Sequence, residues 1–449
     1  MRKISAILLL VVQLLLGQFL FAQVKVAPVN FKERKLANGM RVVTYQDNSS
    51  PSATIQVWYD VGSKNDPPQR NGFAHLFEHI MFKSTKNMKS EQMDRMTEDV
   101  GGWNNASTSD DLTNYFEVVP SNHLERLIWA EAERMSNLTI DEANFLSERK
   151  VVQEEYRQGI EAEPYGRFYE AIQKESFNVH PYKRTTIGTL EDLEAATVPD
   201  VQNFHKTYYR PDNASLIVVG DFDQAQLDGW VNKYFGKIAK PNSTIPRVTE
   251  VEPERTKEKR VVVKAPNVPL PAVAITYLAP PAKDKDIPAL NVAAMILSGG
   301  ESSRLYKELV RNQQIAQDAY FAVDAKTDKG LMYLTATLAS GKTPDMAEKS
   351  LLAELKKIQD LPVKAKELEK AKNGIVAGAI RSLETNDGKA FQIGYAIIQQ
   401  GDPNGINTGL SKIQAVTIAD VQRVMKKYFT DNNRVVIYYI NDDSKGGQQ

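Results

Sequence analysis

Two stretches of the chain repeat one pattern of apolar and polar positions at an offset of 220 residues. The first stretch begins at Thr197 and ends at Val219, and the second begins at Thr417 and ends at Tyr439. In each, a Thr followed three residues later by an Asp predicts the start of a capped helix, and the closing apolar run predicts a strand. The chain therefore predicts two halves with the same local order of elements.

The segments upstream of these stretches also follow one order in both halves. Alternating apolar positions predict strands, and apolar positions three and four residues apart predict the helices between them. The expected strands are 41–45, 54–61 and 113–119 in the first half, and 261–263, 273–278 and 331–338 in the second. One expected helix in each half opens with a start signal, Ser121 as an N-cap in the first and Pro344 in the first turn in the second.

The predicted fold class is α+β, with two homologous domains that each pack helices on an antiparallel sheet. Residues 236–259 are rich in Pro, Lys and Glu and lack apolar periodicity, which predicts a linker between the halves. We place the domains at 23–238 and 260–443, the linker at 239–259 and a flexible tail at 444–449. We expect the duplicated halves to enclose a cavity between them.

The first 22 residues predict an export signal. Two basic residues open the chain, an apolar run extends from Ile4 to Phe21, and the first acidic residue is Glu33. We expect cleavage after Ala22 and a mature chain outside the cytoplasm, in the periplasm, without a membrane span. An uncleaved signal anchor is the alternative, because the apolar run approaches the length that spans a bilayer.

The composition of the 449-residue chain limits its function. It carries 56 basic and 56 acidic residues, and this zero net charge removes the electrostatic basis for nucleic acid as the main partner. It has no cysteine, which excludes disulfides, thiolate nucleophiles and cysteine metal ligands. Any metal must therefore be bound by carboxylates and by some of only five histidines.

Two of these histidines lie in the segment His75-Leu76-Phe77-Glu78-His79. On a helix, His75 and His79 share one face, where both imidazoles can reach one metal ion. Glu78 then lies beside the same ion and can act on a bound water molecule. A surface helix with two ordinary histidines is the alternative, which the spacing and the Glu between the histidines disfavour.

A catalytic zinc ion has three protein ligands and one open position. Val151 and Val152 predict the buried face of a later helix that offers three carboxylates. Glu148 and Glu155 share that face, whereas Glu154 is turned by about 100° toward solvent. We therefore predict Glu155 as the third ligand and Glu148 as the acceptor for the other nitrogen of a ligand imidazole.

With these residues the sequence resembles the inverted-motif zinc peptidases of the pitrilysin and insulinase type. The resemblance covers nearly the whole mature chain and points to the short two-domain branch that includes the mitochondrial processing peptidase and bacterial periplasmic relatives. In that family a ligand Glu follows the His-x-x-Glu-His motif by about 75 residues, and here Glu155 follows His79 by 76. The resemblance implies one zinc ion per chain on His75, His79 and Glu155, although cobalt or manganese could bind the same ligands in vitro.

The resemblance also implies the reaction, which is hydrolysis of a peptide bond with Glu78 as the general base and as the proton donor to the leaving amine. The segment 101–108 resembles an edge strand that pairs with an extended peptide in the family. We therefore expect Asn105, Ala106 and Ser107 to bind substrate by strand addition. An ordinary hairpin is the alternative for this segment, and the residues alone do not decide between the two.

The chain departs from the family pattern in its second half. Family members that act alone carry an Arg and, seven residues later, a Tyr that contact the substrate carbonyl. Here Val310 and Gln317 occupy those positions, and Arg311 and Tyr320 lie nearby but out of register. Donors of this kind are commonly worth about 3–4 kcal/mol of the barrier. Two interpretations remain: a related partner without the zinc motif supplies the Arg and Tyr in a heterodimer, or the chain works alone, or as a homo-oligomer, with Arg311 and Tyr320.

Two other functional classes fit the sequence less well. A non-catalytic assembly or scaffold subunit would not need two His and two Glu in this arrangement. A protein for metal storage or transport would gain little from one site in a large two-domain enclosure. The substrates that we expect are short or unfolded peptides, and their identity and cleavage preference are not encoded in these motifs.

Overall fold

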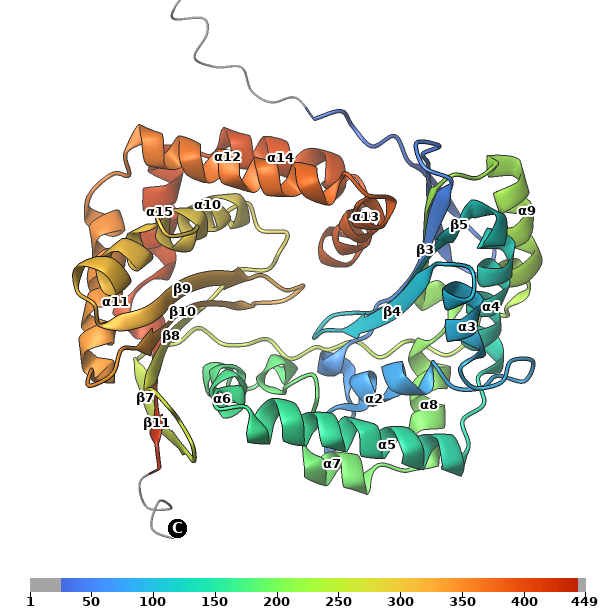
Figure 1. The fold of residues 1–449 in the computed structure, drawn as a ribbon, viewed down its shortest axis with the longest axis horizontal. Coiled ribbons are helices and arrows are strands. Elements are labelled where there is room, and N and C mark those ends of the chain that lie inside the picture. Colours follow the sequence, from blue (N-terminus) through green and yellow to red (C-terminus); the bar gives the residue numbers. More distant parts are fainter. Residues whose placement is uncertain (1–25, 443–449) are drawn as a thin grey trace, which may run out of the picture.

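The computed structural model describes residues 26–442, so the predicted export signal and the predicted tail lie outside the described residues. Two sheets stand in two halves, each with helices packed against it (Figure 1). The first sheet contains β1 (Lys32–Lys35), β2 (Arg41–Gln46), β3 (Ser52–Tyr59), β4 (Trp103–Thr108), β5 (Thr113–Pro120) and β6 (Ala214–Gly220). The second sheet contains β7 (Lys259–Ala265), β8 (Ala272–Leu278), β9 (Ala316–Asp324), β10 (Leu331–Leu338) and β11 (Arg434–Asn441).

The helices divide between the same two halves. Those of the first half are α2 (Phe73–Ile80), α3 (Gln92–Glu98), α4 (Leu124–Asn137), α5 (Glu142–Tyr156), α6 (Gly166–Ser176), α7 (Leu190–Ala195), α8 (Val198–Tyr208) and α9 (Gln224–Tyr234). Those of the second half are α10 (Ile287–Ser298), α11 (Pro344–Asp360), α12 (Ala365–Ser382), α13 (Asn386–Gln400), α14 (Gly405–Ala415) and α15 (Ile418–Tyr428). Within the described residues, no helix is both long enough and apolar enough to cross a bilayer.

The two sheets repeat one topology, which confirms the predicted two-domain α+β fold. After the extra edge strand β1, the order β2-β6-β3-β5-β4 corresponds strand by strand to β7-β11-β8-β10-β9. The repeated helices α8 and α15 both begin with the predicted capping box, formed by Thr197 with Asp200 and by Thr417 with Asp420.

Two local expectations were wrong. Each sheet contains one parallel pair, β2 with β6 and β7 with β11, so the sheets are mixed rather than purely antiparallel. These partners lie at opposite ends of their half of the chain, and a pairing across such a crossover leaves no local sequence signal. Ser121 does not cap the helix that follows, because α4 begins only at Leu124 and the Ser121 hydroxyl donates to Asp221.

One helix of each half packs against the sheet of the other half. Helix α13 packs on the first sheet, where Ala390 and Ile393 join a buried cluster with Trp58 and Ile217. Helix α6 packs in the same way on the second sheet, in a cluster that includes Phe168. Figure 1 shows α13 beside the first sheet and α6 beside the second. This exchange explains why β6 and β8 are buried along their whole length, on both faces.

The turn between β9 and β10 docks on the turn between β4 and β5, so the halves also meet through ion pairs. The Lys326 ammonium pairs with Asp110, and the Thr327 N–H donates to Asp111 at 2.8 Å. Lys64 pairs with the same Asp111 carboxylate at 2.8 Å. Moving the two turns apart would leave buried charges without their partners, which is costly. This contact therefore fixes the end of the β4–β5 hairpin against the second half.

The predicted linker contains no helix or strand until its last residue, Lys259, where β7 begins, and both halves hold it in place. The buried Glu252 carboxylate accepts N–H bonds from Asn178, Val179 and His180, all in the first half, at 2.8–3.0 Å. Arg255 donates to the Asn433 carbonyl of the second half at 2.8 Å. The boundaries that we assigned to the domains and the linker stay a prediction.

The contact of α13 with the first sheet predicts that a single methyl group at Gly394 destabilises the protein. A Cβ at this position would lie 2.1 Å from the buried Trp58 ring. We expect Gly394→Ala to lower the free energy of unfolding by about 1–3 kcal/mol, because the Trp58 ring or α13 must shift to make room for the methyl group. Urea denaturation of the mature chain measures this loss.

Gly409→Ala in α14 is the matched control, because a Cβ there meets no atom within 4 Å. Ala is a better helix former than Gly, so we expect Gly409→Ala to raise the free energy of unfolding by up to about 1 kcal/mol. Equal effects at Gly394 and Gly409 would contradict the tight packing of α13 on Trp58.

Candidate metal centre

Helix α2, which carries His75, Glu78 and His79, is held at its N-terminus by Asp66. The two carboxylate oxygens of this buried residue accept the N–H groups of Gly72 and Ala74, both at 2.8 Å. Burial raises the pKa of Asp66 to about 7, and the two N–H donors oppose that rise. This cap had no signal in the sequence, because Asp66 lies too far before the helix to match an N-cap pattern.

The helix starts where only glycine fits. Gly72 has a φ of 92°, and a Cβ there would lie 2.5 Å from the Ile187 carbonyl oxygen. The left-handed conformation and this close approach together set the direction in which α2 leaves the preceding loop.

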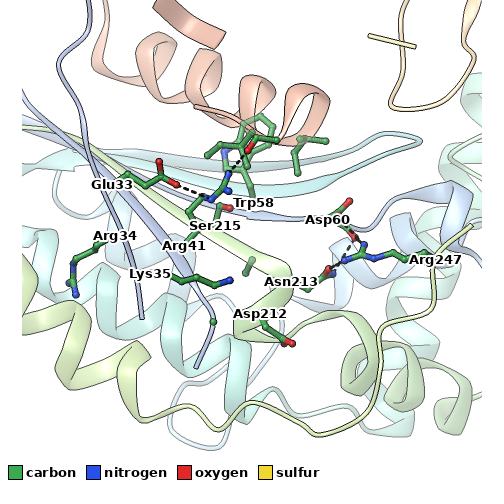
Figure 2. Close-up of a pocket in the computed structure, with 15 residues that line it drawn as sticks. Glu33, Arg34, Lys35, Arg41, Trp58, Asp60, Asp212, Asn213, Ser215 and Arg247 are labelled. Carbon is green, nitrogen blue, oxygen red and sulfur yellow. Dashed lines mark hydrogen bonds and ion pairs between the residues drawn. The ribbon is translucent and has the colours of Figure 1, made fainter. Parts of the chain in front are cut away.

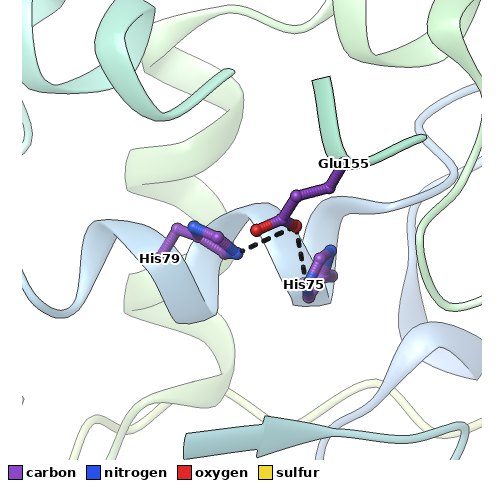
Figure 3. A group of neighbouring side chains, drawn as sticks. All are labelled: His75, His79 and Glu155. Carbon is purple, nitrogen blue, oxygen red and sulfur yellow. Dashed lines mark ion pairs between the residues drawn. The ribbon is translucent and has the colours of Figure 1, made fainter. Parts of the chain in front are cut away.

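His75, His79 and Glu155 come together from α2 and α5, as Figure 3 shows. One ligand atom of each lies within 4.8 Å of the other two. The Glu155 Oε2 atom is 3.7 Å from Nε2 of His75 and 3.5 Å from Nε2 of His79. Two atoms bound to a tetrahedral zinc ion at about 2.0–2.1 Å are about 3.4 Å apart. The spacing of these side chains therefore fits a shared metal ion.

Glu155 lies at the end of α5, which packs against α2 and continues into a π-helix, η3 (Arg157–Ala162). Val152 is buried as expected, but Val151 is 41% exposed, so the buried face of α5 is narrower than predicted. Glu154 is exposed and pairs with Arg157 at 3.5 Å. Glu155 thus faces α2, while Glu154 faces away from it.

The two histidines have different electrostatic surroundings. Burial, with a smaller contribution from His79, lowers the pKa of His75 to about 4, so this ring is neutral at pH 7. Burial alone would also lower the pKa of His79, but Glu148, Glu155 and Glu78 outweigh it and raise that pKa. A neutral imidazole offers the lone pair that a metal ligand needs, and the acidic side chains around His79 would favour a cation at this place.

Glu148 lies next to the imidazole ring of His79, on its Nδ1 side. Its Oε2 atom is 3.6 Å from Nδ1 of His79, and its Oε1 atom is 2.7 Å from the Lys83 ammonium. Burial would raise the pKa of Glu148, but His79 and Lys83 outweigh it and lower that pKa. Glu148 is therefore an anion that can hold the His79 ring; the contact with Lys83 had no signal in the sequence.

Glu78 points from α2 toward strand β4, where the Thr108 hydroxyl donates to its Oε2 atom. Burial raises the pKa of Glu78, and the hydrogen bond from Thr108 opposes that rise. Thr108 lies in the predicted segment 101–108, but its contact with Glu78 had no signal in the sequence, because the pairing of a strand residue with a helix residue depends on the tertiary fold.

Asn105, Ala106 and Ser107 lie on β4, the last strand of the first sheet, which pairs on one side only, with β5. The Ala106 N–H bonds to the side-chain oxygen of Asn105 at 2.8 Å rather than to β5, so this N–H faces the free edge. The Ser107 hydroxyl donates to Asn114 of β5 at 2.5 Å. The segment is thus both the outer strand of a hairpin and the edge of the sheet.

Arg311 and Tyr320 belong to other elements of the second half. Arg311 lies in a π-helix, η7 (Tyr306–Asn312), and pairs with Glu301 at 2.7 Å. Tyr320 lies on the edge strand β9 and is 51% exposed. Val310 is half-buried and Gln317 is exposed. The ion pair of Arg311 therefore lies within the second half, between two side chains that are both exposed.

The other clusters of charged and ligand-type side chains are less suited to chemistry. A cavity of about 500 Å³ lies between β2 and α13, so both halves line it (Figure 2). Four of its charged groups pair with one another, Arg41 with Glu33 at 3.2 Å and Arg247 with Asp60 at 2.8 Å. Within residues 26–442, one group of three or more side chains has the spacing of metal ligands, and it is that of His75, His79 and Glu155.

The sequence matches two family models. Residues 41–190 match Insulinase (Peptidase family M16), and residues 195–375 match Peptidase M16 inactive domain. Zinc protease PqqE of Helicobacter pylori is 31% identical over 90% of this chain and 91% of its own length. An Arabidopsis thaliana protein named "Probable mitochondrial-processing peptidase subunit beta" is 25% identical over 89% of this chain and 76% of its own. The crystal structure of a protease from Helicobacter pylori has a TM-score of 0.89 and 30% identity, covering 92% of this chain and 100% of that one.

The cap on α2 predicts that Asp66→Asn destabilises the protein and weakens metal binding. Asn usually replaces Asp at an N-cap at little cost, but its one carbonyl oxygen leaves an NH₂ group facing the second N–H donor. We expect a loss of about 1–3 kcal/mol in the free energy of unfolding, together with faster loss of zinc to a competing chelator, because the position of α2 sets both imidazoles.

Asp223→Asn is the control for this change, because Asp223 caps the distant helix α9 through a single N–H, that of Gln226, at 2.8 Å. We expect this variant to keep the stability and the zinc retention of the unchanged chain. Unchanged zinc retention in Asp66→Asn, measured at a temperature where it stays folded, would contradict the link between the cap and the metal centre.

Proposed function

The chain belongs to the insulinase family of peptidases (peptidase family M16), and from this premise we propose that it is a zinc-dependent endopeptidase with His75, His79 and Glu155 as its metal ligands. The observation that carries this proposal is the spacing of the three side chains, 3.5 and 3.7 Å from Glu155 to the two imidazoles. Two His and a carboxylate form a ligand set typical of catalytic zinc. One zinc ion per chain follows, because the second half offers no comparable group within the described residues.

A zinc ion on these ligands supplies the positive charge that acidifies a water molecule and polarises the scissile carbonyl. Glu78, one residue before the ligand His79, accepts the proton of the attacking water and then gives it to the leaving amine. Burial raises its pKa, which makes the Glu78 carboxylate a stronger base toward the water proton. Glu148 keeps the His79 ring oriented through Nδ1.

The substrates are short or unfolded peptides that bind in an extended form along the free edge of β4. Asn105, Ala106 and Ser107 line this edge. The Ala106 N–H becomes available to a substrate carbonyl once it leaves the Asn105 side chain. Main-chain hydrogen bonds of this kind give affinity without regard to sequence, and side-chain pockets on either side add selectivity.

The chain works as the zinc-bearing subunit of a heteromeric peptidase whose partner supplies the missing Arg and Tyr. Support comes from Val310 and Gln317, which stand where the family has the Arg and the Tyr. Arg311, the nearby alternative, pairs with Glu301 of the same half. A relative of this chain is named as a subunit, mitochondrial-processing peptidase subunit beta. The apolar first segment of the chain supports export and a site of action in the periplasm, after cleavage behind Ala22.

Glutamine variants of three glutamates separate their functions. We expect Glu78→Gln to lower kcat by about 10²–10⁴-fold with unchanged zinc content, because it removes only the proton acceptor. Glu155→Gln should lose both zinc and activity, since a ligand is missing. Glu154→Gln, its exposed neighbour on α5, is the matched control and should change neither.

These effects are measured by cleavage of an unstructured peptide by the chain together with its co-expressed partner, and by the zinc content of the purified chain. A Glu155→Gln variant that kept full zinc and activity, or a Glu154→Gln variant that lost them, would overturn the ligand assignment.

The proposal of a split site predicts that the purified chain alone is nearly inactive, and that a co-expressed relative without the zinc motif restores hydrolysis. Arg311→Ala and Tyr320→Phe should then leave the activity of the pair within about twofold, because neither group contacts the substrate. Robust hydrolysis by the chain alone, abolished by Arg311→Ala, would contradict the partner requirement and favour the self-sufficient enzyme.

A further inference from the structure

We propose that Thr108 is the positioning residue for Glu78, and that it couples the general base to the strand along which the substrate binds. The inference rests on the proposed function, because it assigns a residue to the same reaction. It adds a group that touches neither the metal ligands nor the scissile bond and acts through the Glu78 carboxylate.

A second threonine lies beside Thr108 and does not donate to it. A hydroxyl has one proton to donate. Thr113, opposite Thr108 on β5, uses its proton on the Val61 carbonyl at 3.0 Å. The two threonine hydroxyls are 3.4 Å apart, so Thr113 can only accept from Thr108, and at a long distance. The contact of Thr108 with Glu78 Oε2 is the shorter of the two, so the Thr108 proton goes to that carboxylate and fixes its rotation.

The position of Thr108 is fixed from three sides. It is the last residue of β4, and the turn after it closes with a bond from the Ser109 N–H to the Leu112 carbonyl at 2.8 Å. The next residues, Asp110 and Asp111, are the two carboxylates that the β9–β10 turn of the second half holds. As a β-branched residue on a strand, Thr108 also has a restricted χ1 angle. The second half, which lacks a metal group within the described residues, thus supports the base through the hairpin.

The backbone of Thr108 lies on the edge that we assign to the substrate. Ala106 presents its N–H to the free edge, and Thr108, two residues further along the strand, presents its N–H to the same side. The side chain of Thr108 meanwhile contacts Glu78. Binding of a peptide strand at this edge therefore orders the same residue that orients the base.

Thr108→Val tests this coupling, because valine keeps the shape and removes the hydroxyl. We expect kcat to fall by about 10–100-fold, since a misplaced proton acceptor costs up to about 10² in rate. KM should stay within about twofold, because the strand edge is unchanged, and the zinc content should not change. Thr108→Ser restores the hydroxyl and should recover most of kcat.

Thr337→Val on β10 is the control, a half-buried strand threonine of the second half outside the site, and it should leave kcat and KM unchanged. A double-mutant cycle with Glu78→Gln gives a second measurement. If Thr108 acts through Glu78, Thr108→Val adds less than about twofold to the loss caused by Glu78→Gln. A general structural effect would multiply the two losses.

The outcomes separate this inference from the proposed function. Peptide hydrolysis that is insensitive to Glu78→Gln would overturn the proposed function itself. Hydrolysis that needs Glu78 but keeps its kcat in Thr108→Val would overturn only the proposal that Thr108 positions Glu78. A raised KM with unchanged kcat, a loss of zinc, or no recovery in Thr108→Ser would also overturn it, because each places Thr108 in another function.

Discussion

The structure depends on one constraint, which is that each sheet needs a helix from the other half to cover its second face. Helix α13 of the second half buries Trp58 of the first sheet, and α6 of the first half buries the second sheet. The halves therefore cannot separate without exposing apolar strand faces to water. The candidate metal centre depends on the same packing, because α5, which carries Glu155, continues into a short π-helix, and only three residues separate that π-helix from α6.

The three glutamates near the metal centre have different surroundings. Burial raises the pKa of Glu78, while His79 and Lys83 lower the pKa of Glu148. The side chain of Glu155 is the most exposed of the carboxylates that contact the imidazoles, at 42%. One carboxylate is thus suited to exchange a proton, the second to hold an imidazole as an anion and the third to bind a cation. Two neighbouring carboxyl groups with pKa values pushed apart, as in Glu78 and Glu148, are typical of sites that perform acid–base chemistry.

Local periodicity predicted much of this molecule. The duplicated halves could be predicted because Thr197 and Thr417 begin helices with the same capping box, and a capping box is read from four consecutive residues. The pairing of His75 with His79, and the choice of Glu155 over Glu154, followed from the 3.6-residue period of a helix. What the sequence did not predict depends on contacts between distant segments. The parallel strand pairs, the Asp66 cap, the contact of Thr108 with Glu78 and the ion pair of Lys326 with Asp110 all join residues that no local pattern relates.

The most direct test of the account is X-ray diffraction from crystals of the zinc-loaded chain, with data at the zinc absorption edge. We predict one anomalous peak per chain, about 2.0–2.2 Å from Nε2 of His75, Nε2 of His79 and a carboxylate oxygen of Glu155, with Glu78 beside it but not bound. A peak at another place in the fold, or one coordinated without Glu155, would contradict the assignment of this centre and the peptidase mechanism built on it.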